Sequence, residues 1–143
     1  MIAEEWRPVV AFERLYEVSS FGNVRRMAGS PRCRNTRLVK VIIWGPGYPM
    51  AQLWRDNRRY LLYVHRLVAE TFLGPCPNGY TVNHKDGVKT NNIPTNLEWV
   101  TYLENNLHAY EIGLKQRKRV SLVCRECKQS FQVEPWRIPS RRK

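Results

Sequence analysis

One His and six Asn lie within residues 82–106, the stretch VNHKDGVKTNNIPTNLEWVTYLENN. Histidine is the side chain whose ordinary pKa suits a proton acceptor at neutral pH. Asparagine lacks that basicity, but its amide oxygen can ligate Mg²⁺, which takes only one or two protein ligands. Phosphodiester hydrolysis needs a base that activates water and a cation that offsets charge on the departing oxygen. His84 as the base, with Asn83 and Asn105 as cation ligands, fits those needs.

The local pattern around His84 predicts two strands joined by a polar loop. Residues 80–87 (YTVNHKDG) are typical of a strand that enters a tight turn at Asp86-Gly87. Residues 97–100 (LEWV) are typical of the returning strand. Asp86 is therefore interpreted as a turn residue in preference to a cation ligand.

A helix is predicted after the second strand, because Thr101 and Glu104 have the spacing of a capping box. Gly113 is its expected end. Asn105 then falls in the first turn of this helix, across a small ββα unit from the end of the first strand. Asn96 is expected to hold the loop by bonding to its backbone.

The residues before this unit predict short strands and one helix. Strands are expected at 15–19, 23–27, 38–43, and on both sides of a hairpin tip at Asp56-Asn57. Together they suggest one small antiparallel sheet. Apolar residues then recur at helical spacing from 64 to 72, with a stop at Gly74-Pro75. His65 lies on that helix, where a structural role is expected.

Charge is concentrated in two blocks of the 143-residue chain, which has a formal net charge of +12. Residues 25–60 carry nine basic and one acidic side chain, and residues 115–143 carry ten and two. Such blocks indicate a polyanionic partner, with nucleic acid favoured over an anionic membrane surface. No apolar run reaches the roughly 18 residues of a membrane span, and no signal-peptide pattern is present, so an intracellular protein is expected.

Residues 64–109, which contain the motif described above, resemble the HNH nuclease domain of phage and intron-encoded homing endonucleases. Residues 4–27 resemble the modular segment that often precedes such domains. The resemblance implies a ββα-metal core. With the antiparallel sheet predicted before it and a carboxyl-terminal Cys-x-x-Cys knuckle after it, the expected fold class is α+β. The expected boundaries are 1–60 for a DNA-binding module, 61–114 for the nuclease domain, and 115–143 for a basic linker with a partial zinc ribbon.

The resemblance also implies roles for individual residues. His84 matches the general base, Asn96 the structural Asn of the motif and Asn105 the metal ligand on the helix. Asn83 matches a position that is often Asp in the family, and a neutral amide should hold Mg²⁺ more weakly than a carboxylate. The implied cofactor is Mg²⁺ or Mn²⁺, and the implied partner is double-stranded DNA in the cytoplasm of a bacterium, with a phage or intron as the source of the gene.

The basic blocks supply the candidate phosphate contacts, which set register more than sequence choice. The candidates are Arg25, Arg26, Arg55, Arg58, Arg59, Lys85, Lys89, Lys115, Arg117, Lys118 and Arg119.

Cys124 and Cys127 form a Cys-x-x-Cys knuckle, which is half of a zinc site. A shortened chain, a dimer that shares zinc and a pair of free thiols each fit this pattern. Cys33, Cys76 and His108 are distant alternative ligands.

Three functions remain open from the sequence. The leading one is a Mg²⁺-dependent DNA endonuclease, for which a monomer with one site would nick a single strand and a dimer would change that. The second is a non-catalytic DNA-binding protein on a decayed nuclease core, and the third is an RNA-binding zinc protein.

Overall fold

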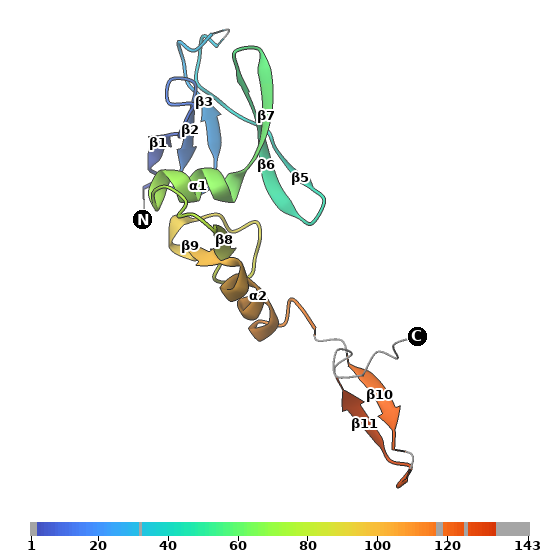
Figure 1. Cartoon of the computed structure of the whole chain (residues 1–143). Helices are drawn as coiled ribbons and strands as arrows, with labels where there is room; N and C mark the ends of the chain where they lie inside the picture. The colour runs from blue at the N-terminus through green and yellow to red at the C-terminus, as the bar shows by residue number, and fades with distance from the viewer. Residues whose placement is uncertain (1–2, 32, 117–118, 125, 134–143) are drawn as a thin grey trace. The chain divides into compact units, whose positions relative to one another are not determined.

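The computed structural model describes residues 3–31, 33–116, 119–124 and 126–133 (Figure 1). Contacts between residues divide the chain into two units, Met1–Asn105 and Asn106–Lys143.

The first unit begins with two antiparallel sheets, where the sequence predicted one. Four strands form the first sheet in sequence order: β1 (Trp6–Pro8), β2 (Tyr16–Ser19), β3 (Val24–Arg26) and β4 (Arg37–Leu38). Three strands form the second sheet: β5 (Val41–Trp44), β6 (Tyr48–Arg55) and β7 (Arg58–Tyr63).

The prediction of one strand over residues 38–43 was wrong because the chain changes partners in the middle of that stretch. The Val39 amide donates to the Val24 carbonyl in the first sheet, at 2.8 Å. Two residues later, Val41 pairs with Ala51 in the second sheet. A β-branched sequence therefore continues through a position where the strand passes from one sheet to the other.

Two tight turns fix the register of the second sheet. Asp56 and Asn57 both have positive φ, 50° and 58°, which is the backbone of a two-residue hairpin, and the predicted tip is confirmed. The β5–β6 turn uses Gly45 and Gly47, both at positive φ. Pro49 is the second residue of β6, near a strand start where proline is tolerated.

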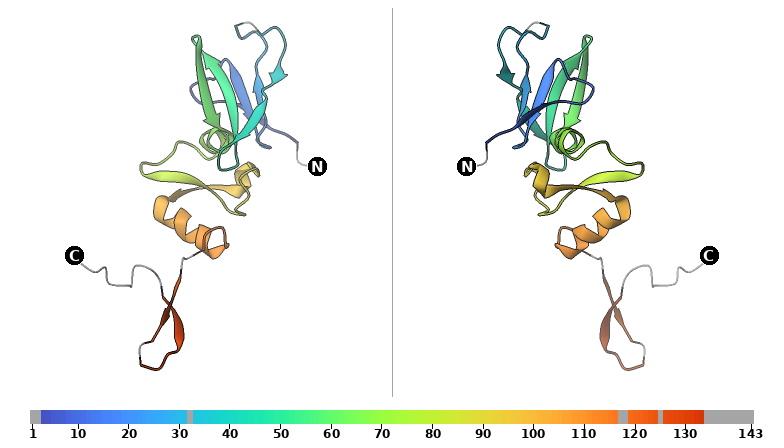
Figure 2. Two further views of the ribbon diagram at one scale, coloured as in Figure 1. Left: turned by 90° about the vertical axis from the view of Figure 1, so that its right-hand side faces the viewer. Right: turned by 90° about the vertical axis from the view of Figure 1, so that its left-hand side faces the viewer.

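Helix α1 (Val64–Phe72) follows β7 directly and lies between the two sheets and the rest of the unit (Figure 1). The predicted helix is confirmed: it ends at Phe72, and Leu73 caps it before Gly74. Next come β8 (Tyr80–His84), a 3₁₀ turn η1 (Pro94–Asn96) and β9 (Leu97–Thr101), with β8 and β9 antiparallel. Both side views in Figure 2 show α1 between the amino-terminal sheets and the β8–β9 pair.

One hydrophobic core joins these parts. It takes residues from both sheets, from α1, and from β8 and β9; the members include Val18, Leu53, Val68, Val82 and Leu97. Helix α1 contacts β2, β6 and β7 as well as β8, β9 and η1. The boundary expected between residues 60 and 61 therefore falls inside β7, and the core is continuous across it.

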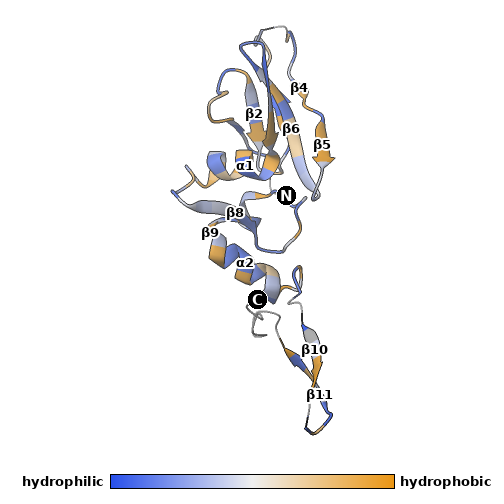
Figure 3. Cartoon of the chain, turned by 45° about the vertical axis from the view of Figure 1, so that its right-hand side comes forward, coloured by the Kyte–Doolittle hydropathy of each residue, from blue (hydrophilic) through white to orange (hydrophobic). Residues whose placement is uncertain are grey.

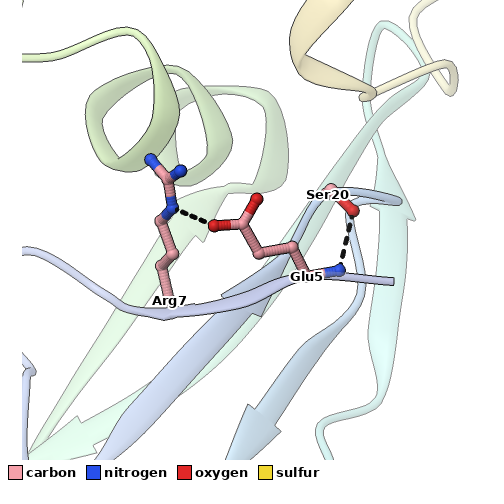
Figure 4. Close-up of polar contacts among 3 residues, drawn as sticks. All are labelled: Glu5, Arg7 and Ser20. Atoms are coloured by element: carbon pink, nitrogen blue, oxygen red, sulfur yellow. Dashed lines mark hydrogen bonds and ion pairs between the residues drawn. The ribbon is translucent and has the colours of Figure 1, made fainter. Parts of the chain in front are cut away.

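Strand β1 anchors the β2–β3 turn (Figure 4). The Glu5 amide donates to Ser20 Oγ at 3.1 Å, and the Ser20 amide donates to the Glu5 carbonyl at 2.8 Å. The Glu5 carboxylate accepts from Arg7 Nε at 2.7 Å, and the Arg7 guanidinium lies 4.6 Å from the centroid of the Phe72 ring in α1. These contacts tie the first strand to the turn and to the helix.

Helix α2 (Tyr102–Glu111) begins in the first unit and continues into the second. Its predicted cap is confirmed: the Thr101 amide donates to Glu104 Oε2 at 2.8 Å, and the Glu104 amide donates to Thr101 Oγ1 at 3.3 Å. The apolar residues Leu103 and Leu107 are exposed on the helix surface.

Strands β10 (Val120–Val123) and β11 (Ser130–Val133) form an antiparallel hairpin in the second unit.

The hydropathy colouring in Figure 3 shows apolar residues on β5 and α2, and Ile43 and Trp44 of β5 are exposed. In the described part of the chain, no helix is long and apolar enough to cross a membrane.

The shared core predicts that the first unit unfolds in one cooperative transition. Leu53→Ala in β6 and Leu97→Ala in β9 should each lower the free energy of unfolding by about 2–5 kcal/mol, because each empties a fully packed site. Leu38→Ala, at a side chain that is 68% exposed, should change it by less than about 0.5 kcal/mol. Denaturant unfolding measures all three. Two separate transitions, each lowered by only one of the core variants, would contradict a single core.

Candidate active site

The β8–β9 pair positions the two polar residues at the end of β8. Its register sets Asn83 opposite Glu98 and His84 opposite Leu97. Side chains alternate along a strand, so Asn83 and His84 point to opposite faces of the pair. Both are buried, each about 6% exposed, which is unusual for polar residues and requires that their hydrogen bonds be satisfied within the protein.

The imidazole of His84 is held by Asn92. His84 Nε2 lies 3.0 Å from Asn92 Oδ1. Because an amide oxygen only accepts, Nε2 is the donor in this contact and Nδ1 carries the lone pair that can accept a proton. Asn92 was not singled out from the sequence, although this loop residue is only 5% exposed. Nothing local distinguishes it from its neighbour Asn91, because its partner lies eight residues away.

A second histidine and an aromatic ring pack on His84. The His65 ring is edge-on to the His84 ring with centroids 5.2 Å apart, and Tyr48 lies 6.1 Å away. His65 also stacks on Tyr63 at 5.3 Å. Burial, with smaller effects from His84 and Arg66, lowers the pKa of His65 to about 3. His65 is therefore neutral at physiological pH, as the structural role expected for it requires.

The loop between β8 and β9 is closed by Asp86 and Asn96. Asp86 Oδ1 accepts from the Val88 amide at 2.8 Å and from Asn96 Nδ2 at 2.9 Å, while Asp86 Oδ2 accepts from Asn91 Nδ2 at 2.6 Å. These hydrogen bonds, the one from Asn91 first, lower the pKa of Asp86 below its ordinary value. The prediction that Asp86 is a turn residue is confirmed, since its carboxylate is engaged within the loop.

Asn96, the last residue of η1, completes the closure of the loop just before β9. Its Oδ1 accepts from the Asp86 amide at 3.1 Å, and its Nδ2 donates to the Asn91 carbonyl at 2.8 Å. The Lys85 amide donates to the Asn96 carbonyl at 2.9 Å. Asn96 thus joins both ends of the loop by side-chain and backbone bonds.

Glu98 supplies a carboxylate next to Asn83, and sequence reasoning missed it. Asn83 Nδ2 donates to Glu98 Oε1 at 2.8 Å, which leaves Asn83 Oδ1 as an unshared acceptor in that contact. The sequence could have identified Glu98, because antiparallel pairing of the two predicted strands places it directly opposite Asn83. The carboxylate that position 83 lacks is therefore present across the strand pair.

Asn105 is the fourth residue of α2 and is half-buried. Within the described part of the chain, no hydrogen bond joins it to Asn83 or His84. The structure therefore places Asn105 in the first turn of the helix that follows β9, as predicted. It forms two separate contacts at the end of β8, one between Asn83 and Glu98 and one between His84 and Asn92.

The donor set fits a hard cation. The amide oxygens of Asn83 and Asn105 and the carboxylate of Glu98 are the kinds of ligand that Mg²⁺ or Mn²⁺ accepts, with water completing the coordination. Over the described residues, no group of three or more His, Cys, Asp or Glu side chains is arranged to hold a metal ion. A site for such a cation here would thus depend on amide oxygens and on Glu98.

Three of the predicted DNA-contacting arginines bond within the protein. Arg25 Nε pairs with Glu17 at 2.7 Å and its guanidinium stacks on Trp6 at 4.1 Å. Arg26 donates to Ser30 Oγ at 3.2 Å and to the Pro31 carbonyl, and Arg55 donates to the Ala11 carbonyl at 2.6 Å. These contacts give the three a part in the fold, whatever else they bind.

The other basic candidates differ in exposure. Arg58 and Arg59 are exposed at the β6–β7 hairpin. Lys85 Nζ donates to the Thr95 carbonyl at 3.0 Å, and Lys89 Nζ donates to the Pro46 carbonyl at 2.7 Å, above the Tyr48 ring. In the second unit, Lys115 bonds to Asn106 and Arg119 is exposed. Arg117 and Lys118 lie outside the described residues.

Two adjoining cavities of about 530 and 430 Å³ lie where the sheets meet. Arg26, Arg37 and Trp54 line both, and Lys40 lines the smaller one. Arg37 and Lys40 were absent from the sequence candidates, although both lie in the first basic block. Their place beside Arg26 follows from the pairing of Arg26 with Arg37 across β3 and β4.

Cys124 and Cys127 lie between β10 and β11 as free thiols. The Lys128 amide donates to the Cys124 carbonyl at 3.1 Å. Hydrogen bonds from the backbones of Cys127 and Glu126 lower the pKa of the Cys124 thiol. These two thiols supply half of the ligands that a structural zinc site needs.

Residues 62–107 match the family described as HNH endonuclease, and residues 4–61 match the NUMOD4 motif. The DNA endonuclease I-HmuI of Bacillus phage SP01 is 30% identical over 122 residues, which are 83% of this chain and 67% of that protein. The chain belongs to the HNH endonuclease family.

Other HNH relatives share the same region. An uncharacterized HNH endonuclease of Acanthamoeba polyphaga mimivirus is 36% identical over 118 residues, 81% of this chain and 33% of that protein. A solved structure of the HNH homing endonuclease I-HmuI, described as showing DNA binding and cleavage, has a TM-score of 0.68 at 27% identity, covering 91% of this chain and 78% of that one. The chain thus spans a third of the mimivirus protein and about two thirds of I-HmuI.

Burial of His65 predicts an acid-sensitive component of stability. The unfolded chain takes up a proton on this imidazole near its ordinary pKa of 6.5, whereas the folded protein does so only near 3. The free energy of unfolding is therefore unaffected by this group above pH 6.5. As the pH falls from 6.5 towards 3, it decreases by up to about 1.4 kcal/mol per pH unit. His65→Gln should remove that part of the slope when the free energy of unfolding is measured against pH. Equal slopes for wild type and variant would contradict this burial.

Proposed function

We propose that this chain is a divalent-metal-dependent HNH endonuclease that hydrolyses one phosphodiester bond of double-stranded DNA per site. The observation that carries the proposal is the held imidazole of His84, whose Nε2 bonds to Asn92 while oxygen donors lie at the adjacent residue and across the strand pair. Family membership supports DNA as substrate, as do the two basic blocks and the likeness to I-HmuI, whose solved structure concerns DNA binding and cleavage.

In this mechanism His84 accepts the proton of the attacking water on Nδ1. The Nε2 contact with Asn92 keeps the ring oriented, and the resulting imidazolium is stabilised because the Asn92 oxygen accepts a hydrogen bond from the Nε2–H group. A bound Mg²⁺ or Mn²⁺ would supply Lewis-acid stabilisation of the scissile phosphate and of the departing 3′ oxygen. Cleavage of that bond leaves a 5′-phosphate end.

Asn83, Asn105 and Glu98 are the residues proposed to hold the cation. Asn83 Oδ1 is the acceptor that the bond to Glu98 leaves unshared, and the Glu98 carboxylate adds the negative charge that an amide lacks. Asn96 and Asp86 fix the loop between the two strands, so their role is to position the others.

The basic surface is proposed to bind the DNA backbone. Arg58 and Arg59 are exposed, and neither forms a salt bridge with the described acidic residues, while Arg37 and Lys40 line the cavities between the sheets. Phosphate contacts of this kind give affinity and register with little sequence choice. Phage and prophage relatives favour bacterial or phage DNA as the substrate.

A non-catalytic DNA-binding protein is the second candidate, and one observation favours it: position 83 is Asn, so the cation site has an amide where the family often has a carboxylate. Glu98 offsets that loss in the leading proposal.

Nicking of supercoiled plasmid tests the activity. Wild-type protein should nick with Mg²⁺ or Mn²⁺ and stop when EDTA is added. His84→Ala should lower the nicking rate by about 10²–10⁴-fold, because general-base catalysis contributes that much, while the Kd for DNA stays unchanged. Wild-type protein that binds DNA tightly but nicks no substrate with either metal would support the non-catalytic alternative.

Replacement of one carboxylate tests the cation site. Glu98→Gln keeps an acceptor for Asn83 Nδ2 but removes the charge, so Mn²⁺ affinity, measured by electron paramagnetic resonance, should fall by about tenfold or more. Glu111→Gln, at an exposed residue at the end of α2, is the matched control and should bind Mn²⁺ as wild type does. Equal affinities for all three proteins would remove Glu98 from the site.

A pair of arginine variants tests the DNA surface. Arg58→Ala should weaken DNA binding and reduce the slope of log K against log salt concentration by about one. Arg55 lies opposite Arg58 in the hairpin but bonds to the Ala11 carbonyl. Arg55→Ala should therefore lower the free energy of unfolding and change the salt slope less than Arg58→Ala does. An unchanged slope for Arg58→Ala would exclude a phosphate contact there.

A further inference from the structure

The β2–β3 turn of the amino-terminal sheet packs directly on the loop that carries Asn92. Gly22 in this turn has φ +78°, and a Cβ built on it would lie 2.9 Å from Asn92 Cβ and 3.6 Å from the Asn92 carbonyl oxygen. Real Cβ atoms essentially never approach that closely. Position 22 therefore admits only glycine unless Asn92 moves.

The turn that carries Gly22 is itself rigidly held. Ser19, which is fully buried, accepts on its Oγ from the Phe21 amide at 3.2 Å and from the Asn23 amide at 3.0 Å. The Gly22 amide donates to the Ser19 carbonyl at 3.0 Å. The Ser20 hydroxyl accepts from the Glu5 amide (Figure 4), and the Ser20 amide donates to the Glu5 carbonyl. A turn held in this way can act as a rigid packing surface for the residue that it contacts.

Asn92 contacts both this turn and His84, the proposed base. Its backbone and Cβ face Gly22, and its Oδ1 accepts from His84 Nε2 at 3.0 Å. A shift of Asn92 therefore moves the acceptor that orients the imidazole. Misplacement of a catalytic group by about 1 Å can cost about 10²-fold in rate, so even a small shift is measurable.

We infer that Asn92 is the positioning residue of His84, and that Gly22 holds Asn92 in place. This inference rests on the proposed nuclease function. It makes the amino-terminal sheet, which the sequence assigned to DNA binding, a structural part of the active site. Without the Asn92 oxygen, the Nε2 proton of His84 loses its acceptor, and the ring is free to adopt orientations and tautomers that do not expose the Nδ1 lone pair to water.

Two glycine variants separate contact from backbone strain. Gly22→Ala places a methyl group against Asn92, whereas Gly29→Ala adds one at almost the same φ, +77°, with nothing within 4 Å. Both carry the cost of a left-handed backbone. Gly22→Ala should lower kcat for nicking by about tenfold or more with KM and the Kd for DNA unchanged, and Gly29→Ala should keep the wild-type kcat. Equal losses in the two variants would overturn the role of Gly22.

Variants at Asn92 test the positioning role itself. Asn92→Leu removes the acceptor and should lower kcat by about 10–100-fold at unchanged KM. Asn92→Asp keeps an acceptor oxygen and should restore most of the rate lost in Asn92→Leu. Nitrogen NMR of the His84 ring should show the Nε2–H tautomer in wild type and a mixture of tautomers in Asn92→Leu. Thermal unfolding of each variant identifies any that fails to fold.

The outcomes distinguish this inference from the proposed function. Wild-type kcat in Gly22→Ala and Asn92→Leu, with an unchanged tautomer, would overturn the inference while the nuclease proposal stands. A wild-type protein that never nicks would overturn the nuclease proposal, and the tautomer measurement on Asn92→Leu would still decide whether Asn92 orients the ring.

Discussion

The packing of α1 on both of its sides is the constraint on which the rest of the structure depends. Val68 and Ala69 are completely buried, and the helix contacts both amino-terminal sheets and the β8–β9 pair. A polar pair such as Asn83 and His84 can stay buried only because the surrounding core holds its hydrogen-bond partners in place. The candidate active site is thus built on a core that the amino-terminal sheets share with the β8–β9 pair. The β2–β3 turn also packs directly on Asn92.

This arrangement explains the many Asn residues around a single His. His84 is the proposed base, and Asn92 bonds to Nε2, the ring nitrogen that the proposed reaction does not use. Asn91 and Asn96 bond to Asp86, whose carboxylate closes the loop. Amide side chains suit these tasks because each donates and accepts, so a short loop can be fixed without burying net charge.

The local parts of the fold were predictable from the sequence, and the long-range parts were not. The Asp56-Asn57 hairpin, the capping box of α2 and the β8–β9 pair follow from short patterns, and the structure contains each of them. The division into two sheets was missed because residues 38–43 have uniform strand character, and the change of partner depends on the core. The roles of Asn92 and Glu98 were missed because both depend on contacts across the loop or the strand pair, although strand register alone identifies Glu98.

The position of a bound metal ion tests the central claim most directly, since the account places the cation at the end of β8. Crystals of the wild-type protein grown with Mn²⁺ and a DNA duplex should give an anomalous-scattering peak about 2.0–2.3 Å from Asn83 Oδ1. Asn105 or Glu98 should provide a further ligand, and His84 should remain uncoordinated. A Mn²⁺ peak that lies elsewhere, or one ligated by His84 itself, would contradict the account, because His84 could not then be the base.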